Sequence, residues 1–204
     1  MRVLRAGDAA LLVETGDLAT SHRLNAALRD DPLPGVVDVV PGEHTVLVIT
    51  DPSADLGGIA ARLPRLPLPD DAEAGAEPVE IPVVYDGADL DEVAELTGLS
   101  REEVVRRHCA GAYTVAYLGF SPGFGYLTGL DPALHVARRA SPRTAVPAGS
   151  VAIAGPYAAV YPSGSPGGWR LLGRSPLRLW DVARDPPCLL RPGTRVRFVP
   201  EERR

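Results

Sequence analysis

Two arginines and a tryptophan stand among glycines and prolines in residues 161–176, YPSGSPGGWRLLGRSP. Proline fixes its own φ and glycine lets the backbone approach a ligand closely, so such a segment loses little entropy when a ligand orders it. A guanidinium is the natural bidentate partner of a carboxylate or phosphate. We therefore predict one wall of a site for a small anionic substrate, with Gly168 turning Trp169 against a cavity and Arg174 aimed inward. The alternative is that Trp169 belongs to an ordinary core and the glycines only shape hairpins.

A second bend, residues 141–150 with the sequence SPRTAVPAGS, carries one arginine and one hydroxyl on either side of a rigid turn. Arg143 is a further candidate for binding an anion, and Ser150 is a candidate for a hydrogen bond to the same ligand. The alternative for Arg143 is an ordinary surface arginine.

A third bend matches the G-x-S-x-G pattern of a hydrolase nucleophile elbow at Gly119, Ser121 and Gly123. In that elbow the residue after the serine donates its backbone N–H to the oxyanion hole, and Pro122 has no N–H. We therefore interpret the segment as a tight turn. Phe124 beside it either packs in the core or forms the floor of the substrate site, where exposed amides could face an anion.

His108 is the remaining candidate for acid–base chemistry. It stands near the end of a helix predicted over residues 101–109, where it is either a general base or a structural histidine at a helix terminus. The other histidines and the two cysteines have no spacing suited to a metal or to a disulfide framework: His22, His44, His135, Cys109 and Cys188. We predict no metal.

The composition excludes several kinds of chemistry. All 21 lysine-or-arginine positions are arginine, so a Schiff-base lysine, a biotinyl-lysine and a standard Walker A loop are absent. Residues 1–100 carry 19 acidic residues against 6 arginines, whereas residues 101–204 carry 7 against 15, which favours an anionic partner for the second half. Its arginines are scattered without interleaved aromatics, so we expect a small carboxylate or phosphate and no nucleic acid.

No apolar run approaches the ~20 residues of a membrane span and no export signal is visible, so we expect a cytoplasmic protein without a membrane partner.

The elements that must position these residues fall into an α+β protein of two domains. Residues 1–70 predict a small α/β domain of ferredoxin-like, two-layer form with the order β-β-α-β-β-α. Five of these six elements have a placed range: strands at residues 9–13, 36–40 and 44–49 and helices at residues 18–29 and 55–63. Proline, alanine and acidic residues then dominate, and we place a linker at residues 71–78.

Residues 79–204 predict a β-barrel domain. A strand over residues 79–85 is followed by helices over 90–96 and 101–109, separated by Gly98, with Ser100 and Glu103 forming a capping box. Short apolar runs between Gly/Pro turns then indicate a barrel or sandwich. These runs are residues 113–118, 150–153, 158–161, 169–172, 177–180 and 195–199.

Three motifs of this second domain, LGFSPGFGYLTGL, SPRTAVPAGSVAIAG and YPSGSPGGWRLLGRSP, resemble the KipI / allophanate-hydrolase-subunit-1 family, which includes the B component of bacterial 5-oxoprolinase. The resemblance covers about residues 79–200 and implies that the second domain is a cyclophilin-like β-barrel. We expect catalytic roles for Arg143, Ser150, Tyr161, Arg174 and His108, and substrate contacts from Phe124, Gly149, Ser165, Gly168 and Trp169.

The resemblance also implies an activity and partners. It implies the B component of an enzyme that hydrolyses 5-oxoproline to glutamate at the expense of ATP, with a KipA-type C component and a LamB-type A component. ATP would bind mainly on those partners, because this chain has no phosphate loop. The alternatives are a KipI-like inhibitor of a sensor histidine kinase and a subunit related to allophanate or urea amidolyase.

One segment departs from the family. Members commonly have Gly-x-Gln-Thr-Gly-Ile-Tyr-Pro, whereas residues 155–162 read GPYAAVYP. Tyr157, Ala158 and Ala159 therefore replace two side chains that form hydrogen bonds and one glycine. This change slightly favours the inhibitor alternative, while the enzyme subunit stays the first hypothesis.

Overall fold

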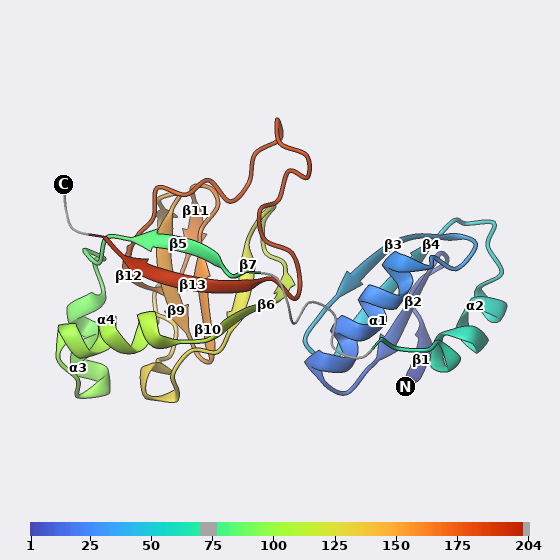
Figure 1. Cartoon of the computed structure of the whole chain (residues 1–204), viewed down its shortest axis with the longest axis horizontal. Helices are drawn as coiled ribbons and strands as arrows, with labels where there is room; N and C mark the ends of the chain where they lie inside the picture. Colours follow the sequence, from blue (N-terminus) through green and yellow to red (C-terminus); the bar gives the residue numbers. More distant parts are fainter. Residues whose placement is uncertain (70–76, 202–204) are drawn as a thin grey trace. The chain divides into compact units, whose positions relative to one another are not determined.

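The computed structural model describes residues 1–69 and 77–201, and the chain divides into two compact units, Met1–Gly75 and Ala76–Arg204 (Figure 1). Residues 71–76 of the predicted linker lie outside the described residues. No helix in the described part of the chain is long and apolar enough to cross a membrane.

The first unit is an antiparallel sheet packed on two helices. Its elements in chain order are β1 Arg2–Arg5, β2 Ala10–Glu14, α1 Leu18–Asp30, β3 Val36–Pro41, β4 Thr45–Thr50, α2 Leu56–Arg62 and the 3₁₀ turn η1 Leu63–Arg65. The strands lie in the order β1-β2-β4-β3. Val46 and Val48 alternate along β4 and pack against Leu24 and Leu28 of α1, as the two-residue period of a strand requires. The chain order β-β-α-β-β-α is the predicted one, but a ferredoxin-like fold has the order β-α-β-β-α-β, so that detail is not confirmed.

The second unit is a barrel-like sheet with two helices beside it. Its helices are α3 Leu90–Thr97, α4 Arg101–Ala110 and the 3₁₀ turn η2 Pro132–Leu134. Its strands are β5 Val79–Val83, β6 Tyr113–Leu118, β7 Gly125–Thr128, β8 Arg143–Val146, β9 Ser150–Ala154, β10 Tyr157–Val160, β11 Ser165–Gly167, β12 Arg170–Arg174 and β13 Arg195–Pro200. Seven of these strands form one sheet in the order β12-β9-β10-β7-β6-β13-β5.

The two end strands of this sheet meet. Val84, directly after β5, and Arg174, at the end of β12, exchange two backbone hydrogen bonds of 2.9 Å. The sheet is therefore nearly closed, which confirms a barrel-like second unit. The pair β8–β11 forms a separate two-stranded sheet, here called the ribbon.

Strand residues alternate between the two faces of the barrel wall. Val151 and Ile153 of β9 belong to the large interior core, whereas Ala152 and Ala154 belong to a smaller cluster with Trp169 and other aromatic residues. Alanines on the outer face leave space, and Val146 of the ribbon packs into the same cluster. Three of the predicted site residues, Phe124, Tyr161 and Trp169, lie in this outer cluster.

The helix pair has the predicted ends. Gly98 ends α3 with a φ of +67°, and the Ser100 hydroxyl accepts the Glu103 N–H at 3.2 Å at the start of α4. One predicted strand is wrong: residues 177–180 lie in a loop and make a single β-bridge, Trp180 to Cys188. Proline at position 176 and the Pro186–Pro187 pair on the facing segment remove the N–H groups that a ladder needs.

Candidate functional site

A buried carboxylate, Asp89, organises the charged part of the site. Its side chain is 2% exposed and accepts two hydrogen bonds from the Arg143 guanidinium, at 2.7 and 2.9 Å. It also accepts Arg139 Nη1 at 2.8 Å and the backbone N–H of Leu171 at 2.7 Å. Burial alone would raise the pKa of Asp89, but the hydrogen bonds from Arg143 and Leu171 and the nearby cations outweigh it and lower the pKa. Asp89 is therefore a stable anion.

A second carboxylate extends this cluster. Glu92, one turn further along α3, forms ion pairs with Arg170 and with Arg139, the latter at 3.3 Å. The cluster thus ties α3 to the segment before β8, to the ribbon and to β12. Three arginines far from α3 in the sequence meet two acids at its start, the N-cap residue Asp89 and Glu92, and no local sequence motif predicts this arrangement.

The two arginines predicted to hold the substrate already hold carboxylates of the chain. Arg143 is bound to Asp89 in the bidentate geometry expected for a ligand. Arg174 pairs with Asp86 at 3.0 Å and its side chain is 62% exposed. The chain itself supplies the anions that the sequence led us to expect from a substrate.

The aromatic part of the site is centred on Phe124. Its ring packs edge-to-face on Tyr161 and Trp169, with centroids 5.3 and 5.5 Å apart. The Tyr161 hydroxyl accepts the backbone N–H of Trp169, and burial is the main cause that raises the Tyr161 pKa. A Cβ at Gly167 would lie 2.3 Å from the Tyr161 hydroxyl oxygen, so only glycine fits there. The structure brings together the three aromatic residues that the sequence predicted.

The predicted small residues hold the strands and loops around this aromatic cluster. Gly149 has a φ of +81° and donates its N–H to the Tyr161 carbonyl at 2.8 Å, and the Ser150 carbonyl accepts the Tyr161 N–H at 2.9 Å. Ser165 faces Val146 across the ribbon, and its buried hydroxyl has no hydrogen-bond partner among the described residues. The Gly168 carbonyl accepts the Arg139 N–H at 2.8 Å. These residues shape the backbone of the site.

The bend with the G-x-S-x-G pattern is a tight turn, as interpreted. The Phe124 N–H donates to the Ser121 carbonyl at 3.0 Å, and β7 begins at Gly125, so a strand rather than a helix follows the serine. Gly123 has a φ of +80°, a conformation that favours glycine.

His108 lies in a different place, the interior core. Its Nδ1 is 2.7 Å from the Tyr85 hydroxyl, and its ring centroid is 4.4 Å from that of Phe198. Burial lowers the pKa of His108 to about 3, so the imidazole is neutral. This environment matches the structural alternative, because His108 packs among core aromatic residues and not on the Phe124 cluster.

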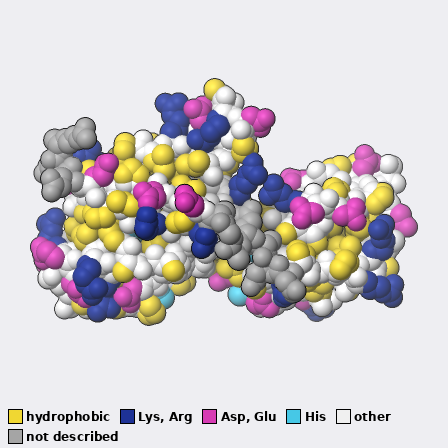
Figure 2. Space-filling model, in the orientation of Figure 1, with side chains coloured by type: hydrophobic (Ala, Val, Ile, Leu, Met, Phe, Trp, Pro, Cys, Tyr) yellow, Lys and Arg dark blue, Asp and Glu magenta, His cyan; other side chains and the backbone are white. Residues whose placement is uncertain are grey.

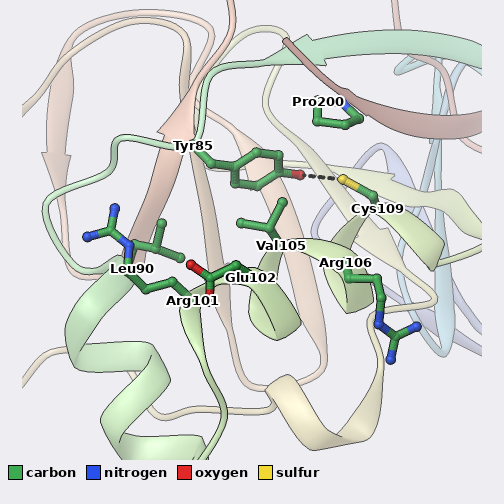
Figure 3. Close-up of a pocket in the computed structure, with 8 residues that line it drawn as sticks. All are labelled: Tyr85, Leu90, Arg101, Glu102, Val105, Arg106, Cys109 and Pro200. Carbon is green, nitrogen blue, oxygen red and sulfur yellow. Dashed lines mark hydrogen bonds between the residues drawn. The ribbon is translucent and has the colours of Figure 1, made fainter. Parts of the chain in front are cut away.

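Sequence reasoning did not single out a cavity of about 510 Å³ beside α4 (Figure 3). Figure 3 shows Tyr85 reaching across it toward Cys109, and the two side chains are 3.2 Å apart. Burial raises the pKa of the Cys109 thiol, so the sulfur is protonated and a weak nucleophile. The remaining lining residues are Leu90, Arg101, Glu102, Val105, Arg106 and Pro200.

The acidic residues of the site are held by arginines and do not gather into a metal centre. Among residues 1–69 and 77–201, no three His, Cys, Asp or Glu side chains lie close enough together to hold a metal ion.

Comparison with known proteins identifies the class to which this barrel-like domain and its companion unit belong. The family described as carboxyltransferase domain, subdomain C and D, matches residues 1–190, and the chain belongs to this family. Among its relatives, the 5-oxoprolinase B subunit of Escherichia coli O157:H7 is 45% identical over 205 residues, which cover 96% of this chain and 94% of the relative. The 5-oxoprolinase B subunit of Bacillus subtilis (strain 168) is 35% identical over 224 residues, covering 97% and 92%.

A solved structure agrees with the fold. The crystal structure of TTHA0988 superposes with a TM-score of 0.86 at 40% identity, and the match covers 96% of this chain and 40% of that one. The family resemblance predicted from the three motifs is thus confirmed, and the match extends into the first unit, where the motifs gave no signal.

Proposed function

We propose that this chain is the B component of an ATP-dependent 5-oxoprolinase-like amidohydrolase, which hydrolyses 5-oxoproline to glutamate. One observation carries the proposal: relatives named as the B subunit of 5-oxoprolinase match over nearly the whole of both chains, the E. coli one at 45% identity. In this proposal the chain is a cytoplasmic protein with a domain of residues 1–70, a linker at 71–78 and a cyclophilin-like barrel from residue 79.

The proposed reaction needs more than this chain. A lactam carbonyl is a poor electrophile, and phosphorylation of its oxygen at the expense of ATP supplies both a leaving group and an anion that cations can stabilise. ATP and the phosphoryl transfer belong to a KipA-type C component and a LamB-type A component, because a chain without lysine has no Walker A loop. This chain contributes a surface that binds and orients the lactam.

The geometry supports specific roles in that surface. Trp169, Phe124 and Tyr161 are at most 5% exposed, and their packed rings form a buried support beneath this surface. Arg143 acts through Asp89 by fixing the ribbon over the barrel, rather than by gripping the substrate. Arg174 is an exposed arginine paired with Asp86, and His108 is a packing residue.

The kinase-inhibitor alternative rested on the altered segment, residues 155–162. In the structure Ala158 and Ala159 are both 0% exposed, the first in the interior core and the second in the outer cluster. The departure therefore changes how the barrel wall packs at two of its three positions, while the third, Tyr157, is partly exposed. The two buried replacements favour neither the inhibitor nor the enzyme.

A reconstitution experiment tests the proposal. The KipA-type and LamB-type partners are assayed for 5-oxoproline-dependent ATP hydrolysis with and without this chain, with glutamate formation as a second readout. We expect both activities to require the chain. Full activity of the partners alone would overturn the proposal, and inhibition of a sensor kinase's autophosphorylation by the chain would support the alternative.

A further inference from the structure

Four arginines lie around the aromatic cluster, and one of them pairs with no carboxylate among the described residues. Arg139, Arg143 and Arg170 pair with Asp89 or Glu92. Arg138 forms no ion pair with any carboxylate of residues 1–69 or 77–201, and it is exposed. Four positive and two negative charges therefore lie around the aromatic cluster, and the exposed positive charge that is left over belongs to Arg138.

The faces of the two units that are turned to the viewer carry arginines and acids interspersed with apolar side chains (Figure 2).

Arg138 is fixed against the aromatic wall. Its guanidinium carbon lies 5.9 Å from the centroid of the Trp169 ring, within the range of a cation–π contact. The neighbouring Arg139 anchors the segment, because its N–H donates to the Gly168 carbonyl at 2.8 Å while its side chain reaches Asp89. The two adjacent arginines thus have different partners: the Arg139 guanidinium binds the buried Asp89 carboxylate, and the Arg138 guanidinium lies over the Trp169 indole.

The ring beneath Arg138 is itself tightly packed. Trp169 is 5% exposed and packs edge-to-face on Phe124 and Tyr126, with both centroids 5.5 Å away. Arg138 is also near the Tyr161 phenol: burial raises the pKa of Tyr161, and the Arg138 charge opposes that rise. A guanidinium held over a ring keeps its N–H edges available for bidentate hydrogen bonds to a planar anion.

We propose that Arg138, held over Trp169, binds the carboxylate of a small monoanionic ligand at this face of the barrel. Within the proposed function, on which the choice of ligand rests, that carboxylate is the one of 5-oxoproline. A single unpaired guanidinium beside an aromatic wall suits one carboxylate on a compact ring. A triphosphate would need several more donors. Arg138 thus takes the role that the sequence predicted for Arg143 and Arg174.

The test compares two ligands that differ only in the carboxylate, 5-oxoproline and 2-pyrrolidinone. The chain is combined with its partner proteins, and ligand binding is followed by tryptophan fluorescence, with steady-state KM and kcat of ATP hydrolysis as the second readout. We expect Arg138→Ala to weaken 5-oxoproline binding by about tenfold or more, as loss of a charge-assisted hydrogen bond implies, and to leave 2-pyrrolidinone binding unchanged. Arg138→Lys should give an intermediate loss because it keeps the charge without the fork.

The matched control is Arg178→Ala, since Arg178 is 75% exposed and pairs with Asp181 in a loop. Unchanged affinity and KM for 5-oxoproline in Arg138→Ala would overturn the proposal while the proposed function stands. If the wild-type complex shows no 5-oxoproline-dependent ATP hydrolysis, the proposed function fails. In that case acetate and benzoate serve as probes, and a fluorescence change that requires Arg138 still supports the carboxylate site. No response to any carboxylate in the wild-type complex would overturn the site.

Discussion

Asp89 and His108 are both buried titratable side chains of the barrel unit, and they are held in opposite ways. Asp89 remains an anion because Arg143, Arg139 and a backbone N–H all donate to it. His108 is surrounded by aromatic rings and a single hydroxyl, and it remains neutral. This difference indicates that a buried side chain stays charged only where distant segments of the chain place hydrogen-bond donors around it. A charged centre therefore joins parts of the chain, whereas a neutral one fills space.

Removal of the charged centre should have the largest effect. In Asp89→Ala, Arg143 and Arg139 lose their buried partner, and we expect the free energy of unfolding to fall by about 3 kcal/mol or more. Urea unfolding followed by tryptophan fluorescence measures this loss in the barrel unit, which contains both tryptophans. The control is Asp86→Ala, whose partner Arg174 is 62% exposed, with an expected loss of about 1 kcal/mol or less. Equal losses in the two variants would refute the distinction between a buried and an exposed pair.

The pH dependence should separate the two centres. The folded-state pKa of His108, about 3, lies below its ordinary 6.5, so between these values the unfolded chain binds a proton that the folded chain does not. Because of His108, the free energy of unfolding therefore decreases as the pH falls below about 6.5, by roughly 1 kcal/mol per pH unit. Asp89, whose pKa is lowered, contributes stability above its ordinary value of 3.8 and loses it only below that value.

Unfolding midpoints measured from pH 7 to pH 4.5 test this separation. His108→Gln cannot titrate, and its amide can still reach Tyr85, so its stability should depend less on pH than that of the wild type. His44→Gln changes an exposed histidine of the other unit and serves as the control. An identical pH slope in His108→Gln and wild type would show that His108 is not the group responsible.

The smallest expected effect concerns the side-chain hydrogen bond between Tyr85 and His108. In Tyr85→Phe, His108 Nδ1 loses its partner at 2.7 Å, and we expect the free energy of unfolding to fall by about 1–2 kcal/mol. Urea unfolding at pH 7 measures it, with Tyr117→Phe as the control outside this contact. A loss as large as that of Asp89→Ala would mean that the neutral centre depends on polar contacts as much as the charged one does.

The fold was largely predictable from local patterns, and the exceptions have physical causes. Short apolar runs located β4, β9 and β13, and Gly98 with Ser100 located the helix ends. The ribbon was missed because β8 and β11 have only four and three residues, and Pro166 interrupts the second. Such short strands depend on the aromatic cluster beneath them, which a local pattern does not describe.

The site was predictable in its aromatic half and not in its charged half. Phe124, Tyr161 and Trp169 stand out because bends of glycine and proline surround them. The Asp89–Arg143 pair joins residues 54 positions apart, and Asp89 looks in sequence like a helix N-cap. In the structure its side chain makes no cap and turns to the arginines instead. Which arginine remains unpaired depends on these long-range contacts.

The position of β13 determines how a C-terminal truncation would affect the barrel. β13 lies between β5 and β6, with Val196 beside Val79 and Arg195 beside Thr114. The family match ends at residue 190, before β13 begins. A fragment that ends at residue 190 would lack one strand of the barrel. It would expose two unpaired strand edges, to which strands of other copies could add. During synthesis, likewise, the wall stays open until β13 itself has been made.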